Sequence, residues 1–207
     1  MQRPGKIVCV GRNYAAHAKE LGNAVPEKPL LFLKPSSAMI GDGEMIILPP
    51  ESAQVEHEAE IAVVIGRRLT RGDEDAARAA ISGLACANDV TARDLQKTDG
   101  QWTRAKGFDT FCPVGPRVLA VNGATTDFSR LEVIGRVNGE VRQHGHTRDM
   151  AFTIPFLVAY ISAIMTLEPG DLVLTGTPEG VGPLRAGDVV EVEVAGVGVL
   201  RNPVGTR

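Results

Sequence analysis

The chain has 207 residues, enough for one domain with a substantial core and too few for two domains of ordinary size. Its 22 basic and 25 acidic residues leave a formal net charge of -3, which argues against a nucleic-acid-binding protein and against a disordered acidic tail. The length therefore predicts a single domain over residues 1–207. Aromatic residues make up only 4%, which argues against a platform for stacking nucleic acid bases.

Short segments rich in Val, Ile and Leu recur along the chain, separated by Gly, Pro or Asp, which is typical of β-strands. The predicted strands are 6–10, 30–33, 45–48, 58–65, 117–121, 132–137, 172–175 and 189–194. Asn138 and Gly139 predict a two-residue hairpin turn, because both residue types tolerate positive φ. A second hairpin is expected around Ala195 and Gly196.

Helix signals are fewer. The predicted helices are 13–21, ended by Gly22, then 74–81, capped by Asp73, and 156–165, with Pro155 in its first turn. The polar segment 90–104 is predicted to be a mobile loop. Many strands with scattered helices predict an α+β, mostly β domain, because an alternating βαβ pattern is missing from the sequence. The glycines of 176–182 lack the GxGxxG spacing, which argues against a dinucleotide site.

The cysteines and apolar runs bear on the compartment. Cys9, Cys86 and Cys112 are odd in number and form no CxxC pair, which argues against a disulfide framework or a structural zinc site and fits a reducing compartment. The longest mostly apolar run, 156–165, is about half the roughly 20 residues that a membrane span needs. No secretory signal pattern is expected before the first strand. We therefore expect a cytoplasmic protein without membrane contact.

Glu58 and Glu60 stand at the head of an apolar strand, two residues apart, so both side chains point to the same face. Two adjacent carboxylates repel each other, and water or a hard divalent cation relieves that repulsion. Asp89 follows the small, apolar run 83–87 and is expected at the exit of a buried strand. Three carboxylates without matched histidines or thiols favour Mg²⁺ or Mn²⁺, with Ca²⁺ allowed, over zinc. A solvated strand end is the alternative interpretation.

His17 and Glu20 are three residues apart on the first predicted helix and are therefore neighbours on one side of it. A carboxylate that orients an imidazole makes a general base able to activate water near neutral pH. An exposed helix pair without catalytic function is the alternative. His57, next to Glu58, points to the opposite strand face and is interpreted as structural.

Lys106 is surrounded by small and apolar residues, so it could hold a substrate carboxylate or a developing enolate oxygen beside a metal, or simply lie at the surface. Arg93 and Asp94 are predicted to pair with each other. His144 and His146 stand in a segment rich in Gly and charged residues and are predicted to be loop histidines.

Six motifs in this order resemble the fumarylacetoacetate hydrolase family, specifically its short, single-domain acylpyruvase or fumarylpyruvate hydrolase branch. They are Val-Gly-Arg-Asn-Tyr at 10–14 with His17 and Glu20, Phe-Leu-Lys-Pro at 32–35, His-Glu-Ala-Glu at 57–60, Asn-Asp-Val-Thr-Ala-Arg-Asp-Leu-Gln at 88–96, Ala-Lys-Gly-Phe-Asp at 105–109 and Leu-Thr-Gly-Thr-Pro-Glu-Gly-Val-Gly at 174–182. The resemblance implies a fumarylacetoacetase-like mixed β-roll with a few short helices, usually assembled as a homodimer.

The resemblance also implies roles for particular residues. Glu58, Glu60 and Asp89 would hold Mg²⁺ or Mn²⁺. The catalytic residues would be His17 and Glu20, which activate water, and Lys106, which polarises the substrate beside the metal. The substrate pocket would be lined by Arg12, Gln96 and Thr177.

The implied reaction is metal-dependent hydrolysis of the C3–C4 bond of a 2,4-dioxo acid, an acylpyruvate such as fumarylpyruvate or acetylpyruvate, through a metal-stabilised enolate. The same residues fit an oxaloacetate tautomerase or decarboxylase, and a 2-hydroxyhepta-2,4-diene-1,7-dioate isomerase or decarboxylase of aromatic catabolism. A catalytically silent metal- or ligand-binding protein is the alternative of another class. It would need none of His17, Glu20 and Lys106, whose joint presence therefore favours an enzyme of small 2-oxo acids.

Overall fold

The computed structural model describes residues 3–206; residues 1–2 and 207 of the predicted domain lie outside this range. The strands are β1 (Ile7–Gly11), β2 (Leu30–Lys34), β3 (Met39–Ile40), β4 (Ile46–Ile47), β5 (Val55–His57), β6 (Ala59–Ile65), β7 (Ile81–Asn88), β8 (Thr91–Ala92), β9 (Cys112–Ala120), β10 (Glu132–Val137), β11 (Glu140–His146), β12 (Leu172–Leu174), β13 (Gly182–Pro183), β14 (Val189–Val194) and β15 (Gly198–Gly205). The helices are α1 (Ala15–Glu20), α2 (Glu74–Ala80), α3 (Arg93–Thr98), α4 (Thr103–Gly107) and α5 (Ile154–Ile164). The mostly β, α+β class predicted from the sequence is confirmed.

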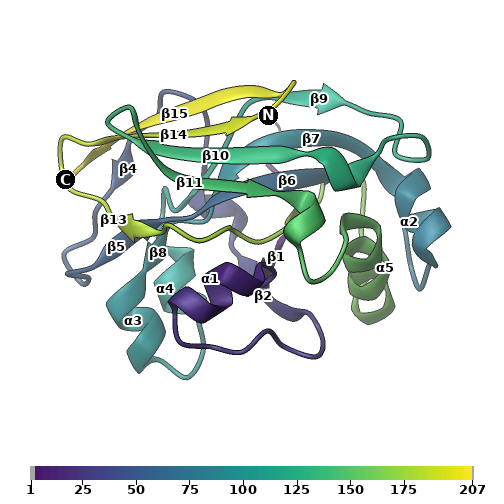
Figure 1. The fold of residues 1–207 in the computed structure, drawn as a ribbon, viewed down its shortest axis with the longest axis horizontal. Helices are drawn as coiled ribbons and strands as arrows, with labels where there is room; N and C mark the ends of the chain where they lie inside the picture. The colour runs from purple at the N-terminus through teal and green to yellow at the C-terminus, as the bar shows by residue number, and fades with distance from the viewer. Residues whose placement is uncertain (1–2, 207) are drawn as a thin grey trace.

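Two large sheets lie face to face (Figure 1). A seven-stranded sheet runs in the order β2-β1-β12-β6-β7-β9-β3, and a five-stranded sheet runs β11-β10-β14-β15-β4. In β10 and β14 every second residue is buried, because one face of the five-stranded sheet packs on its neighbour and the other meets solvent. Val133 and Val192 of that inner face share a core with Ile61 and Leu84 of the seven-stranded sheet.

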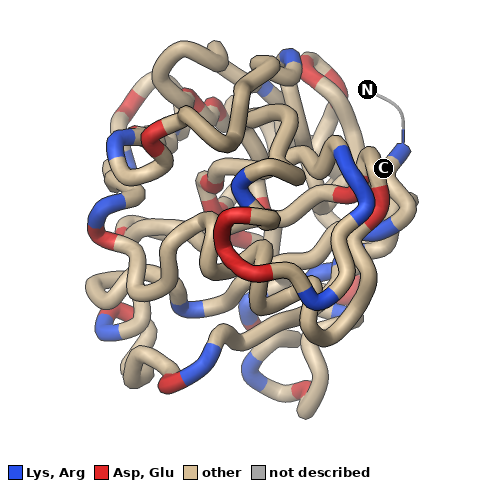
Figure 2. The backbone as a smooth tube through the Cα atoms, turned by 90° about the vertical axis from the view of Figure 1, so that its right-hand side faces the viewer, with Lys and Arg blue, Asp and Glu red and all other residues tan. Residues whose placement is uncertain are grey.

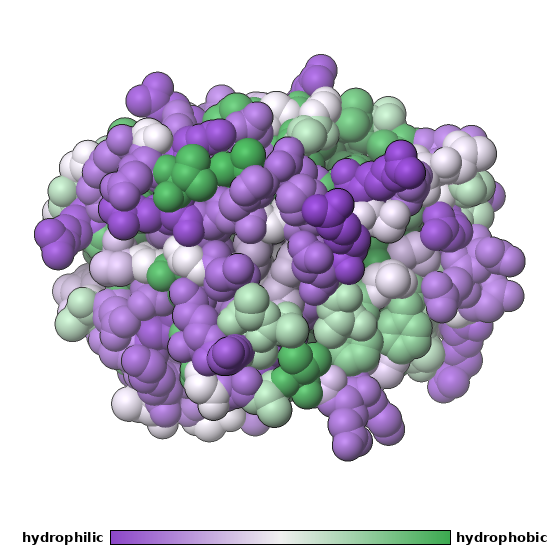
Figure 3. Space-filling model, in the orientation of Figure 1, coloured by the Kyte–Doolittle hydropathy of each residue, from purple (hydrophilic) through white to green (hydrophobic). Residues whose placement is uncertain are grey.

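The helices gather away from the five-stranded sheet. Figure 1 shows α1, α3 and α4 together below the sheets, while α2 and α5 pack at the opposite end. A small third sheet, in the order β13-β5-β8, lies beside the first group. Positive and negative residues are interspersed along the chain (Figure 2), and the face in Figure 3 is mainly hydrophilic with smaller apolar areas. No helix within residues 3–206 is both long and apolar enough to cross a bilayer.

Several predicted elements are confirmed almost to the residue. The strands 132–137 and 189–194 are β10 and β14, and each forms the expected hairpin with the strand that follows it. Asn138 and Gly139 both have positive φ, at 53° and 80°. The three predicted helices correspond to α1, α2 and α5, and Asp73 caps α2 by accepting the Ala76 N–H at 2.9 Å.

The prediction of a mobile loop over 90–104 is wrong. This segment forms β8, α3 and the first turn of α4, and it packs against the site described below. Its helices have only six and five residues, too few to show a helical hydrophobic period in the sequence. They are held by tertiary contacts instead, since Leu95 and Ala105 are buried in one cluster with Val90.

His144 and His146 were predicted to lie in a loop and instead lie near the end of strand β11. The glycine between them favoured the loop interpretation. In the fold, Gly145 turns inward, and a Cβ there would come within 2.6 Å of Pro178. The glycine therefore permits close packing within a strand and does not mark a turn.

Candidate metal centre and active site

The antiparallel pairing of β6 with β7 brings the three predicted metal ligands together. Ala59 pairs with Asn88, so Glu58 and Asp89 are the next residues to face each other, and the Asp89 N–H donates to the Glu58 carbonyl oxygen at 2.9 Å. Glu60 lies two residues along, on the same face as Glu58. All three side chains are buried, and one oxygen atom from each lies within 4.8 Å of the others.

Buried cations hold two of these carboxylates. Lys106 Nζ donates to Glu58 Oε2 at 2.9 Å and to Asp89 Oδ2 at 2.7 Å. Arg93 Nη2 donates to Glu58 Oε1 at 2.6 Å, and Lys34 Nζ donates to Asp89 Oδ1 at 2.6 Å. An ammonium group has three protons, of which these contacts use two on Lys106, so a third remains for a ligand in the cavity.

Glu60 differs from the other two carboxylates. Its Oε2 accepts the Gly176 N–H at 2.8 Å, but within residues 3–206 no Lys or Arg nitrogen lies within 4.0 Å of it. Burial, followed by the neighbouring Asp89 and Glu58, raises the pKa of Glu60 well above its ordinary value. A cation between the three carboxylates would remove this cost of keeping Glu60 ionised.

The charges of the surrounding network favour the same conclusion. It contains four buried carboxylates and three buried cations, namely Glu56, Glu58, Glu60 and Asp89 with Lys34, Arg93 and Lys106. The network is therefore short of positive charge, and the three converging side chains offer only oxygen donors. This donor set fits Mg²⁺ or Mn²⁺, with Ca²⁺ also compatible, better than it fits a metal that prefers nitrogen or sulfur.

The ionisation of the paired groups follows from their contacts. Burial alone raises the pKa of Glu58, but the cations of Lys106 and Arg93 outweigh it and hold that pKa well below its ordinary range. Burial lowers the pKa of Lys106, yet Asp89 and Glu58 outweigh it and raise the pKa above the ordinary lysine value. Lys106 is thus a charged ammonium at neutral pH and a donor of hydrogen bonds.

Helix α1 carries the predicted water-activating pair. His17 Nδ1 lies 3.1 Å from Glu20 Oε2, and the imidazole is buried at the edge of the cavity that contains Glu58. Because Nδ1 is engaged by Glu20, Nε2 is the ring nitrogen left for chemistry in the cavity. A carboxylate that fixes the imidazole in this way is the arrangement expected of a general base.

The loop after β12 donates hydrogen bonds to Glu20, the partner of His17, and to Glu60. Gly180 donates its N–H to Glu20 Oε1 at 2.9 Å, as Gly176 does to Glu60. Both glycines have positive φ, at 94° and 99°, and a Cβ on Gly180 would lie 1.9 Å from the Arg142 carbonyl oxygen. Glycine is required at 180 by both conformation and space. The Gly-rich motif therefore orients two acidic side chains, Glu20 and Glu60.

One cavity of about 340 Å³ contains nearly all the predicted site residues. Those that line it are Arg12, His17, Glu58, Glu60, Asp89, Gln96, Lys106 and Thr177. Glu20 acts on this cavity only through His17. The structure thus brings together residues that are up to 165 positions apart in the chain, from five segments that are separate in sequence.

An aromatic wall closes one side of the cavity. The guanidinium of Arg12 lies 5.9 Å above the ring of Trp102, which meets Phe32 edge-on with the ring centroids 5.2 Å apart. Arg12 has a φ of 58°, a left-handed conformation that is uncommon for a residue with a side chain. A Cβ on Gly11 would lie 2.9 Å from Trp102, so glycine at this position lets the ring approach the strand.

Sequence reasoning missed the functions of Lys34 and Arg93. Lys34 follows four apolar residues in β2, and a lone charge in an apolar run is the signal that could have indicated a buried ion pair. The predicted pairing of Arg93 with Asp94 is wrong. Adjacent residues on a helix point in different directions, so Arg93 turns inward to Glu56 and Glu58, while Asp94 accepts from Ser52 Oγ at 2.6 Å.

Gln143 was also missed. Its Oε1 lies 3.0 Å from His57 Nδ1 and accepts the Ala59 N–H at 2.9 Å, so one atom holds the residues on both sides of Glu58. Its Nε2 donates to Thr177 Oγ1 at 2.7 Å. This buried amide joins β11 to both the segment that carries Glu58 and the cavity wall. Nothing in the local sequence indicates that role, because all its partners are distant in the chain.

Comparison with known proteins places these observations in a family. Residues 6–205 match the fumarylacetoacetate (FAA) hydrolase C-terminal family. The mitochondrial oxaloacetate tautomerase FAHD1 of Arabidopsis thaliana is 48% identical over 206 residues, covering 98% of this chain and 92% of that protein.

Solved structures give the same result. The 2-hydroxyhepta-2,4-diene-1,7-dioate isomerase of Mycobacterium marinum is 46% identical with a TM-score of 0.89, covering 99% of this chain and 76% of that one. The fumarylpyruvate hydrolase of Pseudomonas aeruginosa, solved with Mn²⁺ and pyruvate, is 29% identical with a TM-score of 0.91, covering 98% and 90%. The chain therefore belongs to the fumarylacetoacetate hydrolase family.

Proposed function

We propose that the protein is a Mg²⁺- or Mn²⁺-dependent hydrolase that cleaves the C3–C4 bond of a 2,4-dioxo acid to give pyruvate and a carboxylic acid. Acylpyruvates such as fumarylpyruvate and acetylpyruvate are the proposed substrates. One observation carries the proposal: a single cavity combines three converging carboxylates, the buried ammonium of Lys106 and the imidazole of His17 held by Glu20. A protein that only bound metal would need the carboxylates alone.

The carboxylates of Glu58, Glu60 and Asp89 would hold the divalent cation. When bound there, the ion would supply Lewis-acid polarisation to the oxygen atoms of a 2-oxo acid. The match between this chain and a fumarylpyruvate hydrolase solved with Mn²⁺ and pyruvate supports the choice of ion and of substrate class.

His17 acts on water in this proposal. Its Nε2 takes a proton from a water molecule, whose oxygen adds to the C4 carbonyl carbon of the dioxo acid. Glu20 keeps Nδ1 protonated and stabilises the imidazolium that results. When the C3–C4 bond breaks, its electron pair passes to the pyruvate fragment as an enolate, and a proton returned to C3 completes pyruvate.

Lys106 stabilises the negative charge that develops during this cleavage. Its ammonium is already fixed by Glu58 and Asp89, so it stabilises negative charge on the departing enolate without prior rearrangement. Arg12, Gln96 and Thr177 line the same cavity and are proposed to orient the substrate. A guanidinium is suited to the second carboxylate of a short dicarboxylic substrate such as fumarylpyruvate.

A second candidate function is oxaloacetate tautomerisation. The specific observation in its favour is the 48% identity to an oxaloacetate tautomerase over nearly the whole chain. Oxaloacetate would pass through the same enolate, but no water would be added and no carbon–carbon bond would break. His17 would then transfer a proton to or from C3.

We also propose that the protein functions as a homodimer, since the resemblance that predicted the fold predicts this assembly. Light scattering coupled to size-exclusion chromatography should give a mass near twice the 22.0 kDa of the chain. A monomeric mass at the concentrations used for activity would contradict the proposal.

The decisive assay follows the ultraviolet absorbance of acetylpyruvate and fumarylpyruvate, with Mg²⁺ and with a chelator, while lactate dehydrogenase reports pyruvate. Metal-dependent loss of diketo absorbance with one pyruvate for each molecule consumed would support hydrolysis. If the protein consumed the enol of oxaloacetate without releasing pyruvate and did not act on either acylpyruvate, it would be a tautomerase and not a hydrolase. Inertness toward all three would contradict both.

A further inference from the structure

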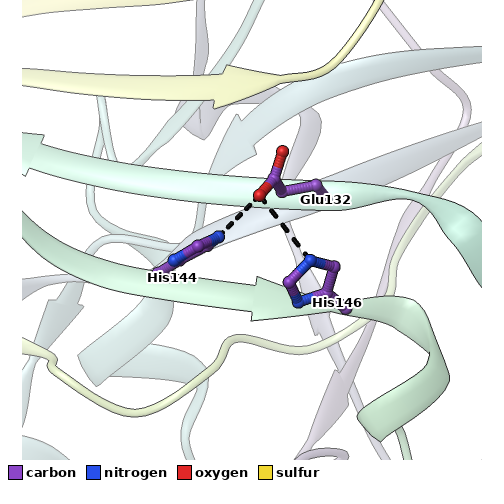
Figure 4. Close-up of side chains that lie close together, drawn as sticks. All are labelled: Glu132, His144 and His146. Carbon is purple, nitrogen blue, oxygen red and sulfur yellow. Dashed lines mark hydrogen bonds and ion pairs between the residues drawn. The ribbon is translucent and has the colours of Figure 1, made fainter.

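A second cluster of side chains with metal-ligating atoms lies on the outer face of the hairpin formed by β10 and β11. Glu132, His144 and His146 each offer one donor atom, and these atoms lie within 4.8 Å of one another. Figure 4 shows both imidazoles turned toward the Glu132 carboxylate. None of the three lines the cavity described above.

The strand register creates this arrangement. Glu132 pairs directly with His146 across the hairpin, and His144 is two residues back along β11, so all three side chains share one face. The intervening Gly145 and the preceding Gln143 point to the other face and are buried. Because Gln143 is fixed by four hydrogen-bonding contacts, the backbone that presents the two histidines is well anchored.

The distances allow one metal ion to reach all three donors, only two of which are hydrogen-bonded to each other. His144 Nε2 lies 2.6 Å from Glu132 Oε1, whereas His146 Nε2 lies 3.6 Å from that same atom, too far for a hydrogen bond. A tetrahedral zinc ion with ligand bonds of about 2.0–2.1 Å sets its ligand atoms about 3.3 Å apart. A small movement of each side chain would therefore satisfy all three donors at once.

His146 is also oriented for such a role. Its Nδ1 lies 3.9 Å from Asp149 Oδ2, so a carboxylate faces the nitrogen that points away from Glu132. This separation is longer than a hydrogen bond, so Asp149 acts through its charge, which favours a proton on Nδ1 and leaves Nε2 to bind metal. The two imidazole rings lie 5.2 Å apart and tilted by 41°, so they converge on Glu132 without stacking flat against each other.

We propose that Glu132, His144 and His146 form a second metal site, specific for Zn²⁺ or a similar transition metal ion. Two imidazoles and one carboxylate suit zinc, whereas the three carboxylates of the cavity suit Mg²⁺ or Mn²⁺. The imidazoles of His144 and His146 and the Glu132 carboxylate are about one-third to one-half exposed, so water would complete the coordination. This inference is independent of the proposed hydrolase function.

The test counts zinc ions in the whole protein. Chelator-stripped protein is titrated with Zn²⁺ against a chromophoric chelator in the presence of excess Mg²⁺, and the same titration is done on His144→Ala and His146→Ala. Each variant should bind one zinc ion fewer than the wild type. The difference is the readout, so the result does not depend on whether zinc also enters the carboxylate site.

Two matched controls make the count specific. Glu132→Gln removes the carboxylate ligand, whereas Glu140→Gln removes an exposed carboxylate from the same hairpin outside the cluster. Glu132→Gln should weaken zinc binding at least about tenfold and Glu140→Gln should leave it unchanged. His17→Ala removes an imidazole elsewhere and should keep the full zinc count.

Co²⁺ provides an independent signal in the same proteins. Its visible absorption bands should show nitrogen ligation in the wild type and lose that component in His146→Ala. Equal zinc counts and equal Co²⁺ spectra for the wild type and both histidine variants would overturn the proposal. If a histidine-to-alanine variant loses its native circular dichroism spectrum, its loss of zinc reflects misfolding, and His146→Asn is used in its place. A lower zinc count in His146→Asn would support the proposal, and an unchanged count would overturn it.

Discussion

Glu58 and Asp89 face each other across the end of the ladder between β6 and β7, and the Lys106 ammonium joins their carboxylates with contacts of 2.9 and 2.7 Å. The backbone reinforces this relationship, because the Asp89 N–H donates to the Glu58 carbonyl oxygen. The pair is therefore held before any ligand arrives. Glu60, on the same face but without a cation of its own, completes a site that is short of positive charge.

Glu60→Gln should separate metal binding from folding. The amide keeps the size of the side chain and can still accept the Gly176 N–H, but it cannot ionise beside the two other buried carboxylates. We expect the metal-free variant to melt at the same temperature as the wild type or higher. Saturating Mg²⁺, at 100 times its dissociation constant, should stabilise the wild type by about 2.7 kcal/mol and the variant hardly at all.

Differential scanning calorimetry with and without Mg²⁺ measures both effects of Glu60→Gln. Glu140→Gln, an exposed change on β11, serves as the control and should keep the full Mg²⁺ response. An unaltered Mg²⁺ response in Glu60→Gln would remove Glu60 from the metal site.

Lys34→Met should destabilise the fold without changing the cavity wall. Lys34 is fully buried, and its loss would leave Asp89 with one cationic partner in place of two. Breaking a buried ion pair from one side costs about 3–5 kcal/mol, so the free energy of unfolding in urea should fall by that order. Lys28→Met, an exposed change just before the same strand, should alter it by no more than about 0.5 kcal/mol. Equal values for the two variants would contradict the buried pairing.

The base and its orienting carboxylate can be tested separately. His17→Ala should lower kcat for the proposed hydrolysis by about 10²- to 10⁴-fold while Mg²⁺ binding persists. In Glu20→Gln the amide oxygen can still accept the Gly180 N–H. The amide then has no second oxygen to accept a hydrogen bond from His17 Nδ1, as the carboxylate does. We therefore expect a fall in kcat with little change in the melting temperature. A normal kcat in Glu20→Gln would show that Glu20 is only a helix residue.

Gly180→Ala should be much more harmful than Gly187→Ala. Both glycines have a φ near 93°, so alanine is strained at either position, at a cost of about 1–3 kcal/mol. A Cβ at 187 would meet nothing within 4 Å, whereas at 180 it would overlap the Arg142 carbonyl oxygen. The second variant thus measures backbone strain alone.

For Gly180→Ala we expect a larger loss of unfolding free energy than for Gly187→Ala, together with lower kcat, because the displaced loop no longer holds Glu20. Urea titration and the pyruvate assay give the two quantities. If both variants lost the same stability and kept the same kcat, the loop would have no part in orienting the base.

Much of the fold was predictable because the signals are local. The strands β10 and β14 alternate buried and exposed residues, and Asn138-Gly139 specifies its turn by conformation alone. The segment 90–104 was not predictable in this way. Its two short helices have too few residues for a period and depend on contacts such as Asp94 with Ser52, which are 42 positions apart.

The candidate site shows the same division. Glu58, Glu60 and His17 could be selected from spacing, since each relation spans two or three residues. The meeting of Glu58 with Asp89 depends on the β6–β7 register, which short-range spacing does not determine. Lys34 and Gln143 act through partners at least 34 positions away, so their functions emerge only when the sheets are assembled.

The most direct test of the central claim is the titration of chelator-stripped protein with Mn²⁺, followed by electron paramagnetic resonance of the free ion. It is best done in the His146→Ala chain, because the proposed site on the outer hairpin then lacks one of its three ligands. We expect this chain to bind one Mn²⁺. Adding His17→Ala should leave Mn²⁺ binding intact, whereas adding Glu60→Gln should abolish it. Pyruvate should be released from acylpyruvate only when both Mn²⁺ and His17 are present. Unchanged Mn²⁺ binding after Glu60→Gln, or full activity without the ion, would contradict the account.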